Sequence, residues 1–242
     1  MKIIISPAKT FKIKKMKLSN KDLLFEKKTG KLVSMLKGKT LEELRNTWKC
    51  SENIANEGFE LYDKFELSPK GCAIASFCGL QYQYMDIESF NRDDIDFLEE
   101  HLRIMSGLYG ILRPLDEISK YRLDFEDKFI NMYEYWEKEI KDHFKGEDII
   151  DLASKEYGEN IYKYFDKIPL KIDFKEEVCS NGSVKLKTKA TSSKILRGRM
   201  VNFIAKNKVR DTEKLKEFSC DGYFYSQKQS KNNRFVFVKS LK

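Results

Sequence analysis

The chain has 242 residues, of which 41% are hydrophobic and 35% charged, and its 46 basic and 38 acidic side chains leave a net charge of +8. This composition is typical of a globular protein that can bury a full hydrophobic core. We expect no membrane contact, because no apolar run approaches the roughly 20 residues of a membrane helix, and no signal peptide, because residues 3–5 are too short an apolar run.

The first predicted element is a short apolar strand, residues 2–5. It ends in a loop that contains Ser6, Pro7 and Lys9. A hydroxyl and a lysine beyond a buried strand are a common place for a site in α/β proteins. The same pattern is also typical of a strand that ends at a proline turn with its lysine in solvent.

Predicted helices follow at 21–37, 40–46, 51–65 and 92–104, with a strand at 72–77 between them. After the last helix, Gly107 and Gly110 stand three apart among apolar residues and predict a tight hairpin between two helices. Exposed amides from Ser106 to Gly110, with Arg113 and Arg122 nearby, suit phosphate recognition. A plain turn that buries its leucines is the alternative.

The second half of the chain alternates between strand-like and helix-like segments. Strands are predicted at 148–153, 169–174, 183–189, 222–226 and 234–239, and helices at 132–144, 154–165 and 193–207. Asn181-Gly182 predicts a β-hairpin. The pattern favours an α/β fold in a single compact domain, residues 1–242, with a mixed sheet flanked by helices and the helix-hairpin-helix-like element.

Two further residues in this half are candidates for anion binding. Ser154 follows a buried strand, where its hydroxyl either donates to an anion or caps a helix. Arg197 lies near the start of a helix that follows a basic strand, where the helix dipole and the cations favour a phosphate. A solvated amphipathic helix is the alternative for this segment.

Charge is strongly segregated along the chain. Residues 1–39 carry a net charge of +10, residues 185–242 carry +12, and the middle of the chain carries −14. If both ends meet on one face, they form a basic surface that favours polyanions. A general richness in solvent-exposed lysine explains the same numbers without a partner.

Metal and cofactor signals are weak. Five scattered cysteines indicate reduced thiols in a cytoplasmic protein, and two histidines without a close cysteine pair argue against a zinc site. The chain contains no Walker loop, nucleophile elbow or dinucleotide fingerprint. We therefore expect no metal and no cofactor, and the oligomeric state stays open.

The N-terminal motif and the glycine-rich segment together resemble the YaaA family of peroxide-stress proteins. Residues 1–10 match the family's opening ILISPAKT pattern, and residues 101–116, HLRIMSGLYGILRPLD, match its central signature. Weaker matches continue in order to the end of the chain. The sequence departs from the family pattern at Cys78, Leu80, Tyr84 and Asn202.

This resemblance implies a role in the response to hydrogen peroxide, through limiting free iron and oxidative DNA damage, and binding to nucleic acid through a helix-hairpin-helix-like element. Hairpin amides contact phosphates without reading bases, so we expect DNA binding with weak sequence preference. One alternative is an enzyme acting on a nucleotide or modified nucleic acid in a basic cleft, and another is a scaffold whose basic face binds anions incidentally. A small anionic ligand is a further candidate partner. The expected binding residues are Ser6, Lys9, Ser106, Gly107, Gly110, Arg113, Arg122, Ser154 and Arg197.

Overall fold

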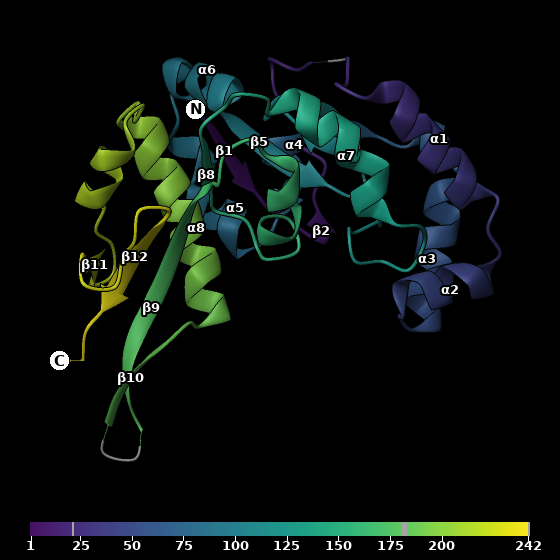
Figure 1. Ribbon diagram of the computed structural model, residues 1–242. Coiled ribbons are helices and arrows are strands. Elements are labelled where there is room, and N and C mark those ends of the chain that lie inside the picture. Colours follow the sequence, from purple (N-terminus) through teal and green to yellow (C-terminus); the bar gives the residue numbers. More distant parts are fainter. Residues whose placement is uncertain (21, 181–182, 242) are drawn as a thin grey trace.

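The computed structural model describes residues 1–20, 22–180 and 183–241, and one eight-stranded sheet runs through it (Figure 1). Its central strands are parallel, in the order β12-β9-β8-β1-β5. They are β1 (Lys2–Ile5), β5 (Leu102–Ser106), β8 (Ile149–Asp151), β9 (Leu170–Ser180) and β12 (Arg234–Lys239). Antiparallel strands complete it: β6 (Gly110–Leu112), β10 (Ser183–Lys187) and β11 (Tyr223–Tyr225). The predicted mixed α/β fold is confirmed.

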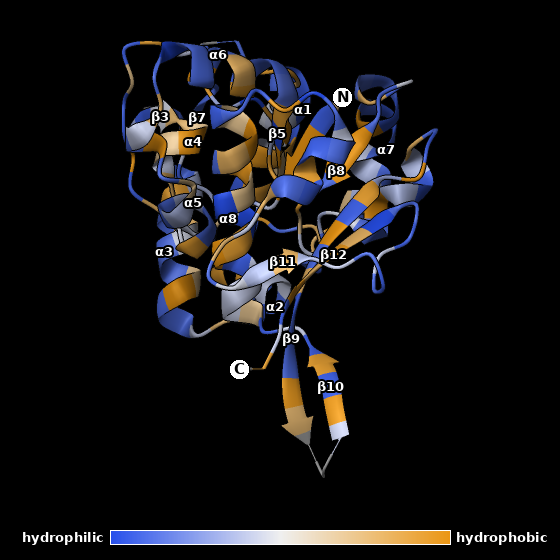
Figure 2. Ribbon diagram, turned by 90° about the vertical axis from the view of Figure 1, so that its left-hand side faces the viewer, coloured by the Kyte–Doolittle hydropathy of each residue, from blue (hydrophilic) through white to orange (hydrophobic). Residues whose placement is uncertain are grey.

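Helices cover both faces of this sheet (Figure 2). On one face, α5 (Leu80–Met85) and α6 (Arg92–His101) pack against α8 (Ala190–Lys206). On the other, α7 (Met132–His143) packs against the 3-10 helix η3 (Glu159–Tyr164). The contact between α5 and α8 is close, because a Cβ at Gly198 would lie 2.1 Å from the carbonyl oxygen of Gln81.

A helical layer lies beside the sheet. It consists of α1 (Glu26–Lys37), α2 (Leu41–Trp48) and α3 (Glu52–Asp63). A capping box fixes the start of α2, since the Glu43 amide donates to Thr40 Oγ1 and the Thr40 amide donates to Glu43. A short turn with Lys49 in the left-handed region joins α2 to α3.

Short elements connect these layers. Two are strand pairs: β2 (Thr10–Phe11) pairs with β4 (Phe77–Cys78), and β3 (Lys70–Cys72) pairs with β7 (Glu117–Ser119). The others are short helices: α4 (Ala73–Ser76), η1 (Phe65–Leu67), η2 (Ile87–Ser89) and η4 (Thr212–Glu217). The predicted strand 72–77 is therefore broken by a turn of helix. The predicted helix 154–165 is reduced to η3.

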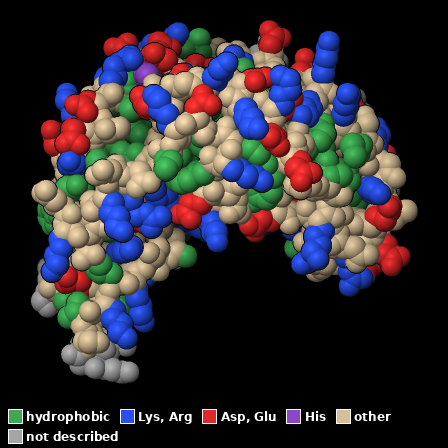
Figure 3. Space-filling view, viewed as in Figure 1, with side chains coloured by type: hydrophobic (Ala, Val, Ile, Leu, Met, Phe, Trp, Pro, Cys, Tyr) green, Lys and Arg blue, Asp and Glu red, His purple; other side chains and the backbone are tan. Residues whose placement is uncertain are grey.

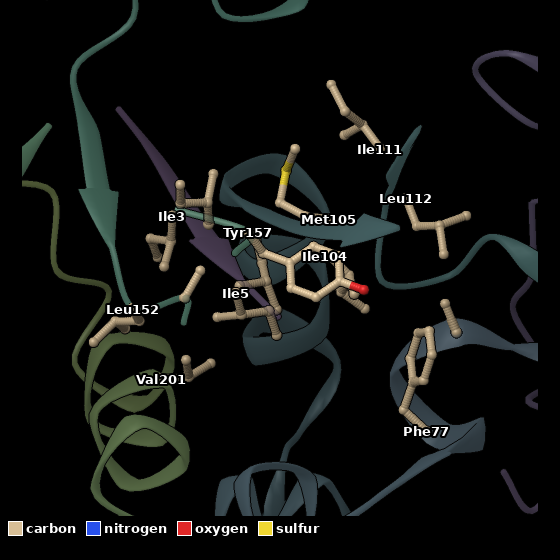
Figure 4. Close-up of a cluster of buried hydrophobic side chains, with 14 of the residues drawn as sticks. Ile3, Ile5, Phe77, Ile104, Met105, Ile111, Leu112, Leu152, Tyr157 and Val201 are labelled. Atoms are coloured by element: carbon tan, nitrogen blue, oxygen red, sulfur yellow. The ribbon is translucent and has the colours of Figure 1, made fainter. Parts of the chain in front are cut away.

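One hydrophobic core extends from Ile3 to Phe237. Its centre is formed by the isoleucines of β1 together with side chains of β5 and α8, such as Ile104 and Val201 (Figure 4). The strand β1 is buried on both faces, as expected for a parallel strand inside a sheet. Among the described residues, every helix is too short or too polar to cross a membrane.

The molecule has the shape of an arch (Figures 1 and 3). One limb contains β10, the outer part of β9 and the start of α8. We call it the basic limb, because four exposed lysines lie on it: Lys185, Lys187, Lys189 and Lys194. The other limb is formed by α2 and α3. The carboxyl ends of β1 and β8 point into the hollow between the limbs, and we call the segments 6–9, 122–127 and 152–157 its roof.

The expected hairpin between two helices at residues 106–110 is wrong. The helix α6 ends at His101, and the chain continues as β5, so the glycine-rich segment joins two antiparallel strands. Leu102 to Ser106 are all buried, and the need to fill the sheet interior overrides the helical pattern of 92–104.

Two other expectations concern the C-terminal third and the charges. The predicted antiparallel pairing of β9 with β10 is confirmed, although Asn181-Gly182 itself lies outside the described residues, and β11 and β12 form a second antiparallel pair. The two basic ends do not form one continuous basic face. The helix α1 lies on the opposite side of the arch from α8, β11 and β12 (Figure 1).

Candidate functional site

The roof lies where the strand order of the sheet changes direction. The parallel strand β5 lies on one side of β1. The next parallel strand along the chain, β8, lies on the other side of β1. The connecting helices α6 and α7 lie on opposite faces (Figures 1 and 2). Such a topological switch point opens a crevice at the carboxyl ends of the strands, which is where α/β proteins bind ligands.

Two predicted hydroxyls meet in this crevice. Ser6 follows β1 and Ser154 follows shortly after β8. The Ser154 amide donates to Ser6 Oγ at 2.8 Å, and Ser6 Oγ donates to Ser154 Oγ at 3.1 Å. Tyr82 holds the loop in place by donating its hydroxyl to the Ser6 carbonyl at 2.8 Å. Residues 148 positions apart are thus joined because their strands are neighbours.

Lys9 contacts a group of carboxylates beside these hydroxyls. Its Nζ lies 2.7 Å from Asp124 Oδ2, and Tyr157 donates its hydroxyl to Asp124 Oδ1 at 2.6 Å. The hydrogen bond with Asp124 raises the pKa of Lys9, so the amine stays charged. Asp127 accepts a hydrogen bond from the Asp124 amide at 2.7 Å.

Two carboxyl groups of the roof titrate near neutrality. Burial, with a further contribution from the charge of Asp124, raises the pKa of Glu156 to about 7. Burial likewise raises the pKa of Asp127 to about 6, although the Asp124 amide works against this shift. Carboxyl groups with a pKa close to neutrality are suited to acid–base chemistry, and buried ion-pair networks produce such shifts too.

A second charged group lies on the other side of the serine pair, under α8. Lys171 is buried and contacts both Asp151 Oδ2 at 2.8 Å and the Ala153 carbonyl at 3.0 Å. Tyr162 donates its hydroxyl to the same carboxylate at 2.6 Å. The sequence analysis missed Asp151 and Lys171. A charged residue within each of two apolar strands was the available signal.

Arg197 lies close to this second group. Burial lowers the pKa of Arg197, whereas the charges of Asp151 and Asp173 raise it, and a guanidinium remains protonated in either case. Its Nε is buried, and within residues 1–20, 22–180 and 183–241 it has no hydrogen-bond partner. Arg197 therefore faces the interior of the molecule, towards Asp151 and Asp173.

Arg122 lies at the other end of the roof, next to α3. Tyr62 fixes its backbone, because the tyrosine hydroxyl donates to the Arg122 carbonyl at 2.9 Å and accepts from the Arg122 amide at 3.2 Å. The guanidinium carbon lies 5.7 Å from the centre of the Trp48 ring. Its Nε is buried and lacks a partner within the part of the chain that the structure describes.

Arg113 does not join these residues. The strand β6 runs back along β5, which brings Arg113 to the opposite edge of the sheet. There its guanidinium binds Asp116 at 2.7 Å and the Asp22 carbonyl at 2.6 Å. Arg113, which was expected among the anion-binding residues, is thus separated from Lys9, Arg122 and Arg197, because the intervening hairpin reverses the chain.

The glycine-rich segment is also closed to a ligand. Ser106, Gly107 and Gly110 are buried. The Ser106 hydroxyl donates to Tyr121 and accepts from the Tyr109 amide, and the Gly107 carbonyl accepts from Trp136 at 2.8 Å. Gly110 has the expected positive φ, 72°, but its Cα faces the Trp136 ring. The exposed amides that the sequence predicted are therefore not found.

The positions that depart from the family pattern lie around α5 and α8. Asn202 donates to the Met85 carbonyl at 2.8 Å, and the Arg199 guanidinium lies over the Tyr84 ring at 5.1 Å. Cys78 belongs to β4 and Leu80 begins α5. Asn202 and Tyr84 thus take part in contacts between α5 and α8, and none of the four positions belongs to the roof.

A cavity of about 850 Å³ opens at the opposite edge of the sheet, near Met1 and Asp148. Several of its charged side chains are paired, such as Lys167 with Asp148 at 2.7 Å and Lys216 with Glu213 at 2.7 Å. None of the residues predicted from the sequence lines it. Volume alone does not identify it as a binding site.

Comparison with known proteins agrees with the resemblance seen in the sequence. A family model described as peroxide stress protein YaaA matches residues 1–229. A UPF0246 protein of Finegoldia magna is 67% identical over 241 residues, which cover 100% of this chain and 99% of that protein. A UPF0246 protein of Desulfitobacterium hafniense is 38% identical over 253 residues, which cover 100% of this chain and 99% of that protein. A UPF0246 protein of Clostridioides difficile is 35% identical over 250 residues, which cover 99% of this chain and 100% of that protein.

Proposed function

This chain belongs to the family of peroxide stress protein YaaA, and we propose that it acts in peroxide stress by binding DNA in the hollow of the arch. In this proposal the DNA backbone lies along the basic limb, where a phosphate contacts Arg197 of α8, and reaches the roof, where a phosphate contacts Arg122. Phosphate contacts position a duplex without reading its sequence, so sequence preference is weak.

The observation that carries this proposal is the basic limb beside two half-buried arginines. Lys185, Lys187 and Lys189 follow one another along the limb, and all three are exposed. The buried Nε atoms of Arg122 and Arg197 have lost hydration without gaining a partner among the described residues, and a phosphate oxygen beside either guanidinium offsets that cost. The other limb carries more acidic than basic side chains, so DNA contacts are expected on one side of the hollow only.

A salt titration tests this function. Duplex DNA should bind at about 50 mM salt and lose affinity by about 100-fold at 200 mM if four phosphates are neutralised. Substituting alanine for Lys185, Lys187 and Lys189 should reduce the slope of log affinity against log salt by about 2–3.

The matched control removes the same number of exposed lysines near the end of α7, at positions 138, 141 and 145. It should leave most of the salt slope unchanged. Equal losses in both triple variants, or no binding at low salt, would contradict DNA binding along the basic limb.

Family membership extends the proposal to limiting free iron and the DNA damage that iron causes. Within the described residues, no group of three or more His, Cys, Asp and Glu side chains is arranged to hold a metal ion. Peroxide-treated cells that carry the wild-type chain should accumulate fewer DNA lesions and less free iron than cells with the lysine triple variant of the basic limb. Lesions and iron that do not differ between the two strains would argue against this role.

An enzyme acting on a nucleotide or modified nucleic acid is the second candidate. It is favoured by the convergence of Ser6, Ser154, Lys9 and Asp124 at the switch point, beside Glu156, whose pKa lies near neutrality. Glu156→Gln should then abolish turnover of such a substrate while leaving DNA affinity at pH 7 within a few-fold of wild type. A fully active variant would remove Glu156 from this role.

A further inference from the structure

A small cavity of about 250 Å³ opens between α3, β2 and the segment 120–122, next to the roof. Its lining divides by chemistry. Lys120 and Arg122 supply two cations, Lys9 supplies a third that is already paired with Asp124 at 2.7 Å, and Phe11, Ile54 and Leu61 supply an apolar wall. Glu57 is the acidic residue of the lining. The cavity therefore carries an excess of positive charge beside an apolar surface.

Arg122 is the feature of this cavity that points to a ligand. Tyr62 anchors its backbone on both sides, and Trp48 lies against its guanidinium, so the side chain is held in place. Its Nε is nevertheless buried without a partner among the described residues. Elsewhere in the protein Arg113 is neutralised by the buried carboxylate of Asp116. A positioned guanidinium that lacks such a partner is suited to an anion that arrives from outside.

The apolar wall limits which anion fits. Phe11 is half-buried, and its ring is held by Tyr121 in an edge-on contact at 5.2 Å and by Phe77 at 4.9 Å. A fixed aromatic ring beside two aliphatic side chains favours a flat, apolar group of the ligand. A volume of about 250 Å³ leaves room for a single monomer unit. A phosphate attached to a planar ring system of that size is a nucleotide.

We propose that this cavity binds one nucleotide, with its phosphate on Arg122, Lys9 and Lys120 and its base against Phe11, Ile54 and Leu61. The nucleotide is either a free nucleoside monophosphate or an unpaired nucleotide of bound DNA, and the second form rests on the proposed function. An unpaired base enters a pocket more readily than a paired one, because no base pair has to be broken.

Calorimetric titration with dAMP, deoxyadenosine and inorganic phosphate tests the cavity directly. dAMP should bind at least 10-fold more tightly than either fragment, because it alone offers both groups. Arg122→Gln should weaken dAMP binding by at least 10-fold, and Phe11→Leu should weaken it less. Arg199→Gln is the matched control, because it removes another guanidinium that lies over an aromatic ring, and it should leave dAMP binding unchanged.

A second measurement distinguishes the two sources of the nucleotide. The fluorescence of 2-aminopurine is recorded in a duplex where this base is bulged and in a duplex where it is paired. At least 10-fold tighter binding of the bulged duplex, lost in Arg122→Gln, supports an unpaired nucleotide of DNA. Binding of dAMP without preference for the bulge supports a free nucleotide.

Two results would overturn the inference. One is inorganic phosphate binding as tightly as dAMP. The other is the absence of both dAMP binding and a bulge preference. Salt-dependent binding of paired duplex can persist in either case, and then the proposed function survives while the cavity is rejected. If the protein binds dAMP but does not bind duplex DNA, DNA is rejected as the partner and the nucleotide site is kept.

Discussion

Arg113 and Arg122 follow the same glycine-rich segment, yet their guanidinium groups have opposite surroundings. Arg113 contacts the fully buried carboxylate of Asp116, with Glu99 3.9 Å away. Arg122 lies against Trp48 and keeps a buried nitrogen without a partner in the described chain. One arginine is satisfied by the fold and the other is not. The state of its partners, not its presence in a motif, indicates which arginine faces a ligand.

The largest expected effect is on stability. Arg113→Ala should lower the free energy of unfolding by about 3 kcal/mol, because it leaves the buried carboxylate of Asp116 without its cation. Arg122→Ala should cost less than about 1 kcal/mol, since it removes one cation–π contact and an unpaired charge. Urea unfolding of both variants measures the difference. Equal losses would remove the distinction between the two arginines.

The glycine-rich segment extends the comparison, since it is expected to serve the fold and not the ligand. A Cβ at Gly107 would lie 2.2 Å from the Leu123 carbonyl oxygen, so Gly107→Ala should cost about 2–3 kcal/mol in thermal or urea unfolding. Its folded fraction should bind DNA as the wild type does.

Gly30→Ala is the control for this substitution. Gly30 lies in α1, and a Cβ there would meet no atom within 4 Å, so alanine should stabilise by up to about 1 kcal/mol. A Gly107→Ala protein of wild-type stability with weakened DNA binding would place this segment in the binding surface after all.

The smallest effect concerns pH and the carboxyl groups beside Lys9. Burial raises the pKa of Glu156 from 4.5 to about 7, so the native state holds this proton more tightly than the unfolded chain does. The stabilising contribution is therefore complete below about pH 4.5 and is lost as pH rises through 7. After allowance for solvent screening, Glu156→Gln should be about 1 kcal/mol more stable than wild type at pH 8 and gain nothing at pH 4.

Urea unfolding of Glu156→Gln and wild type at pH 4 and pH 8 measures whether the gain in stability occurs only at the higher pH. Glu60→Gln, on the exposed side of α3, is the control. A gain that is the same at pH 4 and pH 8 would show that the substitution acts through packing and not through the charge of Glu156.

Sequence reasoning located much of the roof but not its composition. Ser6, Lys9 and Ser154 were found because each follows a buried apolar strand, and strand ends in α/β folds are recognisable from local patterns. Asp151 and Lys171 were not predicted, because each is a single charged residue within an otherwise apolar strand. They form an ion pair across neighbouring strands. Pairing across a sheet depends on strand order, which local sequence does not encode.

The segment 92–112 shows why part of the fold was misassigned. Its first half has a helical pattern and forms α6, but Leu102 to Ser106 continue the apolar run as a central strand. Short apolar runs fit a buried helix or a buried strand equally well, and the space left beside β1 decides between them.

By itself, the sequence determined that this chain is a globular α/β protein, that its strand ends carry hydroxyl and cationic side chains, and which family it belongs to. These properties follow from hydrophobic periodicity, composition and local motifs, all of which act over a few residues. Only the tertiary structure decided that Arg113 is neutralised by Asp116, that Lys9 meets Asp124, and that Arg122 keeps an unpartnered nitrogen in the described chain. The electrostatic environment of a charge depends on residues that are distant in sequence, because burial and ion pairing are properties of the packed molecule.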